Sequence, residues 1–197
     1  VALLGWHPSN NQEIFSIDEL VNSFSMNRIN KSGAVFDKEK LNWMNRHYLK
    51  AISSDDCLEK IQSMLSKKNI IIDNKIKLKF MIEYAQNRVN TLNEIINEIM
   101  CFIECDELNL KLLKKFNFND LGRLWINEIN NLNSINKDNI NNIITKTSNV
   151  LKITGKQLFI PLRLMLINKE HGPDLFTIIN ILGIDESIKR IKRIEKI

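Results

Sequence analysis

The chain has 197 residues, of which 44% are hydrophobic and 26% are charged, and its formal net charge is +5. This composition is too apolar for a disordered chain. The apolar runs in the sequence are shorter than the stretch of about 18 residues that a helix needs to cross a bilayer. We therefore expect a folded protein that does not enter a membrane, whose positive charge permits an anionic partner such as a nucleic acid without requiring one.

The helix signals begin near the N-terminus. Glycine and proline are scarce, at 6 and 3 residues, and apolar residues recur three and four positions apart, which predicts an all-α fold. Ser16 to Glu19 form a capping box that opens a helix reaching about Phe24, and Asp37 caps a second helix after an irregular loop over residues 25 to 36.

The middle of the chain predicts three more amphipathic helices. Two of them begin at Ser53 or Ser54 and at Asn74. The apolar pattern breaks at residues 87 to 90, and a second capping box from Thr91 to Glu94 opens the third. Arg88 is therefore expected on a link between two helices.

The last part of the chain predicts helices over about 107 to 116, 118 to 131 and 137 to 152, and another from Gly155. Pro161 in that helix predicts a kink or break near Phe159. Asp174 caps a short helix that ends at Gly183. In the final helix, residues 185 to 197, the basic side chains opposite the isoleucines predict a solvated face rather than a phosphate-binding strip; they are Lys189, Arg190, Lys192 and Arg193.

The cysteines and the first residues bear on the setting of the chain. Three cysteines without a C-x-x-C pair predict neither a disulfide framework nor a metal knuckle, so we expect a reducing compartment, the cytoplasm. A metal shared by Cys101 and Cys105 is an alternative to buried thiols, although no histidine lies near them in the sequence. The opening VALLGWHP has neither an initiating methionine nor a signal peptide, which indicates a piece of a longer protein.

The side chains that could carry chemistry are dispersed. Three histidines lie in separate segments and no glycine-rich loop follows a strand, so no catalytic residue and no metal site are predicted. Arg88 and Arg163 are better candidates, because a guanidinium can both donate bidentately to a base edge and stack on it. The alternative for both is a solvating surface arginine. Trp43 is either a core residue or, if exposed, a platform for stacking on a nucleotide.

Several segments together resemble the C-terminal part of bacterial-type glutamyl-tRNA synthetases, which are class I ligases. They follow one another from Ala2 to the last helix and read ALLGWHP, KSGAVFDKEKLNWMNRHY, NRVNTLNEI, GKQLFIPLRLML and EHGPDLFTIINILG. The resemblance implies the end of a helical stem-contact domain at residues 1–50 and helical anticodon-binding subdomains at 51–107 and 108–197. It also implies contacts with the anticodon loop by Arg88, Arg163 and Leu175, and contacts near the tRNA stem by Lys31, Lys40, Trp43 and Lys50.

The same resemblance identifies Asn30-Lys31-Ser32 as a look-alike of the ATP-binding lysine loop, because the family's own loop would precede Val1. Asn30 replaces the family's usual serine, which puts one hydroxyl-to-phosphate contact in doubt. ATP, Mg²⁺ and the active site belong by resemblance to the upstream part of the ligase. This chain alone is therefore expected to bind no cofactor and to be inactive.

The implied partner is tRNA(Glu), with tRNA(Gln) left open, while DNA is not expected and a monomer is. The alternative from another class is a freestanding α-helical interaction module without a role in tRNA binding. Glutaminyl-tRNA synthetase is disfavoured, because the anticodon region in its familiar form is a β-barrel and this pattern is helical.

Overall fold

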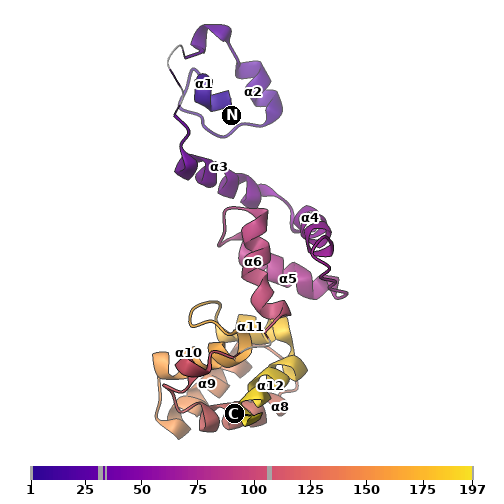
Figure 1. The fold of residues 1–197 in the computed structure, drawn as a ribbon, viewed down its shortest axis with the longest axis vertical. Coiled ribbons are helices and arrows are strands. Elements are labelled where there is room, and N and C mark those ends of the chain that lie inside the picture. Colours follow the sequence, from indigo (N-terminus) through magenta and orange to yellow (C-terminus); the bar gives the residue numbers. More distant parts are fainter. Residues whose placement is uncertain (1, 31–32, 34, 106–107, 197) are drawn as a thin grey trace.

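The structure is a computed structural model that describes residues 2–30, 33, 35–105 and 108–196. Figure 1 shows a long, narrow molecule with the N-terminal segment at one end and the helices of the C-terminal half at the other. Within the described ranges the regular structure is helical, apart from an isolated bridge between Trp6 and Ile29. The prediction of an all-α fold is confirmed. In the same ranges, no helix is both long enough and apolar enough to cross a membrane.

The N-terminal segment is built around Trp6. This side chain is 2% exposed and packs against the rings of Phe15 and Phe24, at centroid distances of 6.2 and 5.8 Å. The backbone N–H of Asn30 donates to the carbonyl of Gly5 (2.8 Å), which closes the segment on itself. Its helical elements are α1 (Ala2–Gly5), α2 (Ile17–Ser23) and the 3-10 helix η1 (Met26–Arg28).

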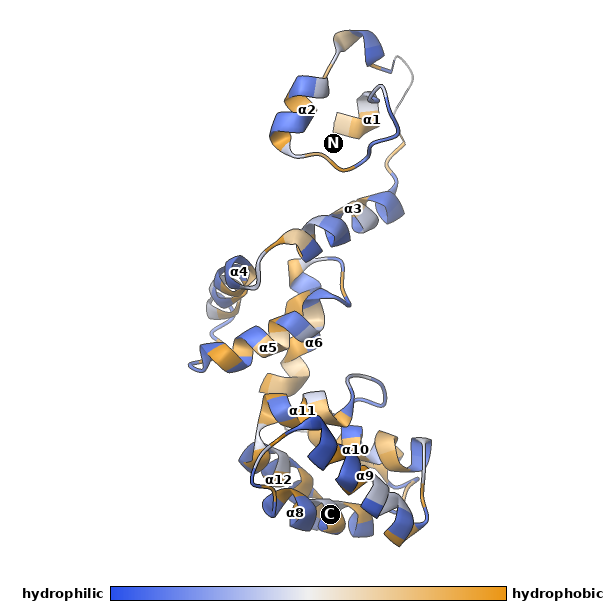
Figure 2. Ribbon diagram, turned by 180° about the vertical axis from the view of Figure 1, so that it is seen from behind, coloured by the Kyte–Doolittle hydropathy of each residue, from blue (hydrophilic) through white to orange (hydrophobic). Residues whose placement is uncertain are grey.

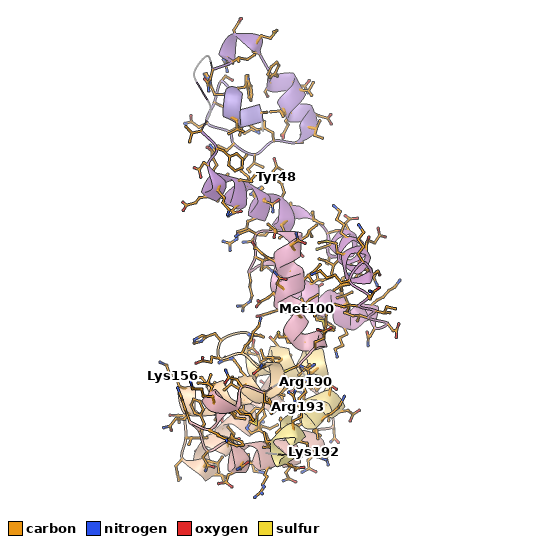
Figure 3. The ribbon with its side chains drawn as sticks, viewed as in Figure 1. Tyr48, Met100, Lys156, Arg190, Lys192 and Arg193 are labelled. Atoms are coloured by element: carbon orange, nitrogen blue, oxygen red, sulfur yellow. The ribbon has the colours of Figure 1, made fainter. Side chains whose placement is uncertain are left out.

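Helix α3 (Lys38–Ala51) connects this segment to the rest of the molecule, and most of its residues are hydrophilic (Figure 2). Tyr48 lies where α3 meets the N-terminal segment (Figure 3), and its hydroxyl donates to the carbonyl of Phe15 (2.7 Å) and accepts from the N–H of Phe15 (3.2 Å). The next residue, Leu49, is 3% exposed and belongs to the main hydrophobic cluster. The side-chain amide of Gln86 donates to the carbonyls of Leu49 (2.6 Å) and Ile52 (3.1 Å). The adjacent residues Tyr48 and Leu49 therefore attach α3 to the N-terminal segment on one side and to the helices that follow it on the other.

Three helices form the middle of the molecule: α4 (Ser54–Ser66), α5 (Lys75–Gln86) and α6 (Leu92–Ile103). Each buries apolar residues four positions apart, which is the spacing that lines one face of a helix. These buried pairs are Ile61 and Leu65 on α4, Leu78 and Ile82 on α5, and Ile95 and Ile99 on α6. The three faces pack together, and α11 (Leu175–Leu182) packs against both α5 and α6 from the C-terminal side.

The starts of these helices follow the caps expected from the sequence. Ser16, Asp37, Ser53 and Asn74 each accept a hydrogen bond from a first-turn N–H, and the capping box at Ser16 is complete. The second capping box is only half formed. Thr91 Oγ1 accepts from the N–H of Glu94 (3.2 Å), but Glu94 Oε2 accepts from the N–H of Asn90 (2.7 Å), one residue before the cap. Glu94 therefore holds the end of the link that precedes α6.

The C-terminal group of helices is larger. It consists of α7 (Leu110–Leu113), α8 (Phe118–Asn130), α9 (Lys137–Leu151), α10 (Lys156–Ile167), α11, α12 (Ile184–Lys192) and the 3-10 helix η2 (Arg193–Lys196). Helix α10 is continuous through Pro161, so the predicted break near Phe159 does not occur. Burial of the flanking Leu158 and Leu162 stabilises the helix despite the donor that proline lacks. The expected single helix over 185 to 197 is instead α12 followed by η2.

One close approach in this group requires a glycine. A Cβ atom placed on Gly122 of α8 would lie 2.3 Å from Cδ1 of Ile194 in η2. Ile194 is itself 4% exposed, so it has little room to move away.

The main hydrophobic cluster runs from Leu49 to Ile194 and includes residues of both the middle and the C-terminal helices. The boundaries expected at residues 50/51 and 107/108 stay predictions.

The expectation of a solvated basic face on the last helix is wrong for Arg190. Its side chain lies between α6 and α10, and the residue is 4% exposed. The guanidinium donates to the carbonyls of Cys101 (2.9 Å) and Phe102 (2.8 Å) at the end of α6 and of Leu166 (2.8 Å) at the end of α10. The final carbonyls of a helix have no partner within the helix, so a buried cation with several donors satisfies them well.

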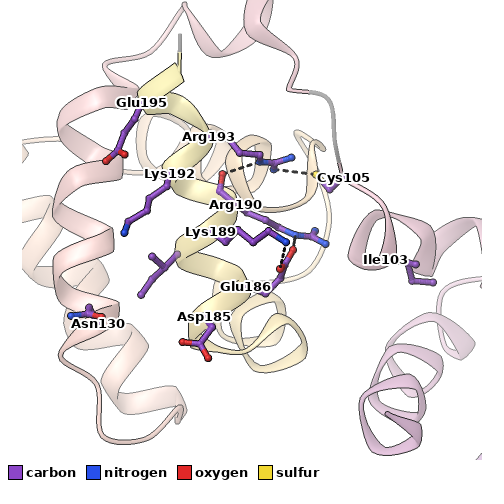
Figure 4. A pocket seen from close by; sticks show the side chains of 11 residues that line it. Ile103, Cys105, Asn130, Asp185, Glu186, Lys189, Arg190, Lys192, Arg193 and Glu195 are labelled. Atoms are coloured by element: carbon purple, nitrogen blue, oxygen red, sulfur yellow. Dashed lines mark hydrogen bonds and ion pairs between the residues drawn. The ribbon is translucent and has the colours of Figure 1, made fainter. Parts of the chain in front are cut away.

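Two neighbours of Arg190 complete this junction (Figure 4). Glu186 Oε1 accepts from Arg190 Nε (2.8 Å), which gives the buried guanidinium a counter-charge. Burial by itself raises the pKa of Glu186, but the hydrogen bond and the charge of Arg190 outweigh burial and hold this pKa below its usual value. The half-buried Arg193 donates to the carbonyl of Met165 (2.8 Å) and to Cys105 Sγ (3.4 Å).

Replacing Arg190 should therefore destabilise the whole fold. In Arg190→Met the carbonyls at the ends of α6 and α10 lose their donor and Glu186 Oε1 loses its buried partner, so the free energy of unfolding should fall by about 3 kcal/mol or more. The matched control Lys192→Met removes an exposed charge from the same helix and should change it by about 0.5 kcal/mol or less. Urea denaturation of the two variants and the unmodified chain measures the difference. Equal stability of all three proteins would contradict a structural role for the Arg190 junction.

Candidate nucleic-acid interface

Arg88 lies on the link between α5 and α6, where the sequence placed it. Its backbone N–H donates to the carbonyl of Ala85 (2.8 Å), which ends α5 in a tight turn. The side chain is exposed, and its guanidinium lies 4.6 Å from the centroid of the Tyr84 ring. Among the described residues the guanidinium has no hydrogen-bond partner. Its plane is therefore supported by an aromatic ring while its donors face solvent, as contact with an anion or a base edge requires.

The Tyr84 ring is itself held in place. Its edge contacts Phe102, with centroids 5.7 Å apart and ring planes at 88°, and its hydroxyl donates to Glu98 Oε1 (3.0 Å). Burial, followed by the charge of Glu98, raises the pKa of Tyr84 well above its usual range. The hydroxyl consequently stays protonated and remains a donor at any physiological pH.

Helix α3 supports the same link from the N-terminal side. Arg46 Nη2 donates to the carbonyl of Arg88 (3.5 Å), and the side-chain amide of Asn45 donates to the carbonyl of Asn90. The expected stem-contact helix and the link that carries Arg88 are thus in direct contact. Sequence reasoning did not single out Asn45, Arg46 or Tyr84, although the four-residue spacing of Tyr84 and Arg88 at the end of a helix is a recognisable signal.

The side of α3 that faces away from the helical core carries several candidates. The candidates Lys40, Trp43 and Lys50 lie at intervals of three and seven residues, with His47 between the last two, so all four share one side of the helix. Trp43 is 49% exposed, which decides between its two interpretations in favour of an accessible ring. Lys50 is exposed, whereas Lys40 forms an ion pair with Glu13. Lys31 lies outside the described residues.

Arg163 and Leu175 come together around the loop of residues 168–174. Arg163 is half-buried on α10, and its Nε donates to the carbonyl of Pro173 (3.0 Å). Its guanidinium also lies 5.7 Å from the centroid of the Phe159 ring. Leu175 is the first residue of α11 and is 1% exposed, so its side chain packs in the core. A ligand contact at Leu175 would have to use the backbone.

Asp174 organises the end of this loop. Its Oδ1 accepts from the N–H of Thr177 (3.0 Å) and its Oδ2 accepts from the hydroxyl of Thr177 (2.7 Å), so the predicted cap of α11 is present. Burial by itself raises the pKa of Asp174, but these hydrogen bonds outweigh burial and lower the pKa below its usual value.

The link of residues 87–91 and the loop of residues 168–174 project from the same side of the molecule, left in Figure 1 and right in Figure 2.

Other features offer little for a ligand. The hollow beside α12 in Figure 4 is lined by both acidic and basic side chains, among them Asp185, Glu186, Lys189 and Lys192, so it does not favour an anion. Cys57 and Cys105 are buried and Cys101 is half-buried. In the part of the chain that the structure describes, no three His, Cys, Asp or Glu side chains converge as metal ligands.

Comparison with known proteins identifies the family. A family model described as an anticodon binding domain matches residues 38–195. The protein belongs to this family. The match includes α3, the Arg88 link and the loop of residues 168–174, so the candidate residues that the structure describes lie inside the anticodon binding domain. The alternative of a freestanding interaction module finds no support in these comparisons.

The chain is also similar to glutamate–tRNA ligases. It is 31% identical over 202 residues to the ligase of Natranaerobius thermophilus, covering 97% of this chain and 41% of that protein. It is 32% identical over 199 residues to the ligase of Finegoldia magna, covering 98% and 40%. The crystal structure of the glutamate–tRNA synthetase of Elizabethkingia anophelis matches with a TM-score of 0.84 at 27% identity, covering 100% of this chain and 39% of that one. The chain thus spans about two fifths of these relatives, 41% in the first case, and corresponds to their C-terminal part.

The cap at Asp174 predicts a pH dependence. Because the pKa of Asp174 is lower in the folded than in the unfolded chain, its ionisation stabilises the fold above the unfolded pKa of about 4, and this contribution is lost as the pH falls through the lower folded pKa. Asp174→Asn keeps an oxygen that can cap the helix but has no carboxyl group to protonate. Its free energy of unfolding should therefore decrease less than that of the unmodified chain when the pH falls from about 7 to about 3. Urea denaturation across this range tests the difference.

The control for this prediction is Asp138→Asn, which changes an exposed acid in the first turn of α9. Asp138 makes no hydrogen bonds like those of Asp174 among the described residues. The Asp138→Asn variant should therefore resemble the unmodified protein in its acid sensitivity more closely than Asp174→Asn does. If both variants changed the acid sensitivity equally, the hydrogen bonds of Asp174 would not explain its effect.

Proposed function

We propose that this chain is the tRNA-recognition part of a longer glutamate–tRNA ligase and that it binds the stem and the anticodon loop of a tRNA. The observation that carries the proposal is the match of the anticodon binding domain family over residues 38–195. The exposed Arg88, stacked on Tyr84 with its donors toward solvent, supports it. The molecule is also long and narrow, so sites on α3 and in the C-terminal half can contact separate parts of one extended RNA (Figure 1).

The proposed division of labour follows from side-chain chemistry. Lys40, Lys50 and the exposed Trp43 lie on α3, where lysines neutralise phosphates without distinguishing bases and an indole can stack. Lys31 is assigned to the same stem contacts by family resemblance alone. Arg88 donates to a base that is unstacked from the anticodon loop. Arg163 and the backbone at Leu175 contribute at the second loop, because the Leu175 side chain is buried.

The whole ligase, in this proposal, uses ATP and Mg²⁺ to activate glutamate and attaches it to tRNA(Glu) through residues outside this chain. Charging of tRNA(Gln) by the same enzyme is the second candidate for its specificity. The chain acts as a monomer in the cytoplasm, does not bind DNA, and binds no cofactor by itself. The chain selects the tRNA and positions it on the ligase, so the chain has no catalytic activity alone.

Replacing Arg88 should weaken binding in a way that depends on the anticodon. The loss of a well-made contact to a base edge corresponds to about 1–3 kcal/mol, so Arg88→Ala should bind a tRNA(Glu) transcript about 5- to 150-fold more weakly. The affinity for tRNA(Gln) should change less, because that anticodon lacks the favoured base at the contacted position. Arg123→Ala, which removes an exposed arginine from α8, is the matched control. Filter binding at two salt concentrations measures all of these affinities.

The outcomes of that experiment separate the proposals. No binding of either tRNA by the unmodified chain at low salt would contradict a tRNA-binding role for this chain. Equal binding of both tRNAs, unchanged by Arg88→Ala, would make Arg88 structural and would favour an enzyme that charges both tRNAs.

Replacing Lys50 should have a different signature. A lysine that neutralises one phosphate contributes about 0.7–0.9 to the slope of log affinity against log salt, so Lys50→Ala should reduce that slope by about 1. It should also weaken the binding of tRNA(Glu) and tRNA(Gln) by the same factor, because phosphates carry no sequence information. A salt titration with both transcripts tests this. An unchanged slope, or a loss confined to one tRNA, would remove Lys50 from the phosphate contacts.

A further inference from the structure

The carboxylate of Glu98 lies between the two segments that carry the candidate arginines. Its Oε1 accepts from the hydroxyl of Tyr84 (3.0 Å), whose ring supports Arg88. Its Oε2 accepts from Nζ of Lys169 (3.2 Å), which belongs to the loop of residues 168–174. One side chain of α6 therefore contacts both the support of Arg88 and the second loop, using a different oxygen for each.

The loop of residues 168–174 is also held at its two ends. At its start, Asn168 has a positive φ of 53° and its side-chain oxygen accepts from the N–H of Asn109 (2.9 Å). At its end, the carbonyl of Pro173 accepts from Arg163 (3.0 Å). Both of these contacts lie within the C-terminal half of the chain. The ion pair of Lys169 is different, because it joins the loop to α6, which starts at the link that carries Arg88.

An ion pair in this position contributes little to global stability. The side chain of Glu98 is 28% exposed and that of Lys169 is 35% exposed, so water screens part of their attraction. The position of the attached groups is a different matter. A carboxylate that accepts from both a phenol and an ammonium restricts the rotamers of both donors, and fixing groups before a ligand arrives lowers the entropy lost on binding.

We propose that Glu98 is a positioning residue that couples the Arg88 link to the loop of residues 168–174, so that both contact one RNA loop as a unit. The inference rests on the proposed function, because the ligand is the anticodon loop of a tRNA. Glu98 does not contact the RNA. It acts through the Tyr84 ring under Arg88 and through Lys169 in the second loop.

Electrostatics alone predicts the opposite sign for a change at Glu98. Removing a negative charge near a polyanion strengthens binding, so an uninvolved Glu98 would give a Glu98→Gln variant that binds tRNA as well as or better than the unmodified chain. Positioning predicts weaker binding, by about 3- to 10-fold, which is in the range of coupling through a network of contacts. Glu83→Gln is the matched control, because it removes an exposed acid next to Tyr84 on α5.

The decisive experiment is a double-mutant cycle of Glu98→Gln and Arg88→Ala, measured by binding of a tRNA(Glu) transcript to the 197-residue chain. Since Glu98 acts in part through Arg88, Glu98→Gln should weaken binding by a smaller factor in the Arg88→Ala background than in the unmodified chain. Losses that multiply, or a Glu98→Gln variant that binds like Glu83→Gln, would overturn the inference while leaving the proposed function intact.

A measurement without RNA tests the coupling of the two segments separately from the proposed function. Lys169→Met breaks the ion pair from the second loop, and its effect on the backbone amides of residues 88–91 can be followed by NMR in the free chain. The inference expects their chemical shifts to move. The control Lys146→Met, which breaks the ion pair with Glu128 between α8 and α9, should leave them unchanged. Unmoved amides in Lys169→Met would show that the two segments are not coupled, whether or not the chain binds tRNA.

Discussion

The buried ends of α6 and α10 need hydrogen-bond donors, and this need determines how the middle and the C-terminal helices meet. The last carbonyls of a helix have no partner within it, and the contacts that Arg190 makes with those of Phe102 and Leu166 are buried. Arg190 satisfies carbonyls of both helices with one planar guanidinium. Because this group is rigid and always charged, it fixes the helix ends relative to each other rather than merely drawing them together.

This junction also determines where the recognition segments lie. Helix α6 begins after the link that carries Arg88, and its C-terminal end contacts Arg190. The C-terminal end of α10 also contacts Arg190, and the loop of residues 168–174 follows it. The two segments are therefore joined twice, by Arg190 at the buried ends of their helices and by Glu98 nearer the surface. At the other end of the middle group, Gln86 and Tyr48 attach α3 and the N-terminal segment. A narrow molecule can thereby present separate contacts in a defined order along its length.

The candidate site was predictable to the extent that it depends on local signals. The break between two apolar patterns placed Arg88 on a link, and the cap at Asp174 placed the second loop, and both features are present. Leu175 shows the limit of this approach, because the residue that follows a cap can point either into the core or toward solvent. Tyr84 and Glu98 lie on ordinary helical positions, and only their contacts with Arg88 and Lys169 single them out.

By itself, the sequence determined the helices, most of their caps and the helical class of the fold, because capping and apolar periodicity act within a few residues of each other. The tertiary structure decided that Arg190 is buried rather than solvated, that α10 continues through Pro161, and which side chains support Arg88. The physical reason is the same in each case. These outcomes depend on carbonyls, apolar faces and carboxylates that are contributed by helices far away in the chain, and a local pattern contains no information about which of these partners will be adjacent.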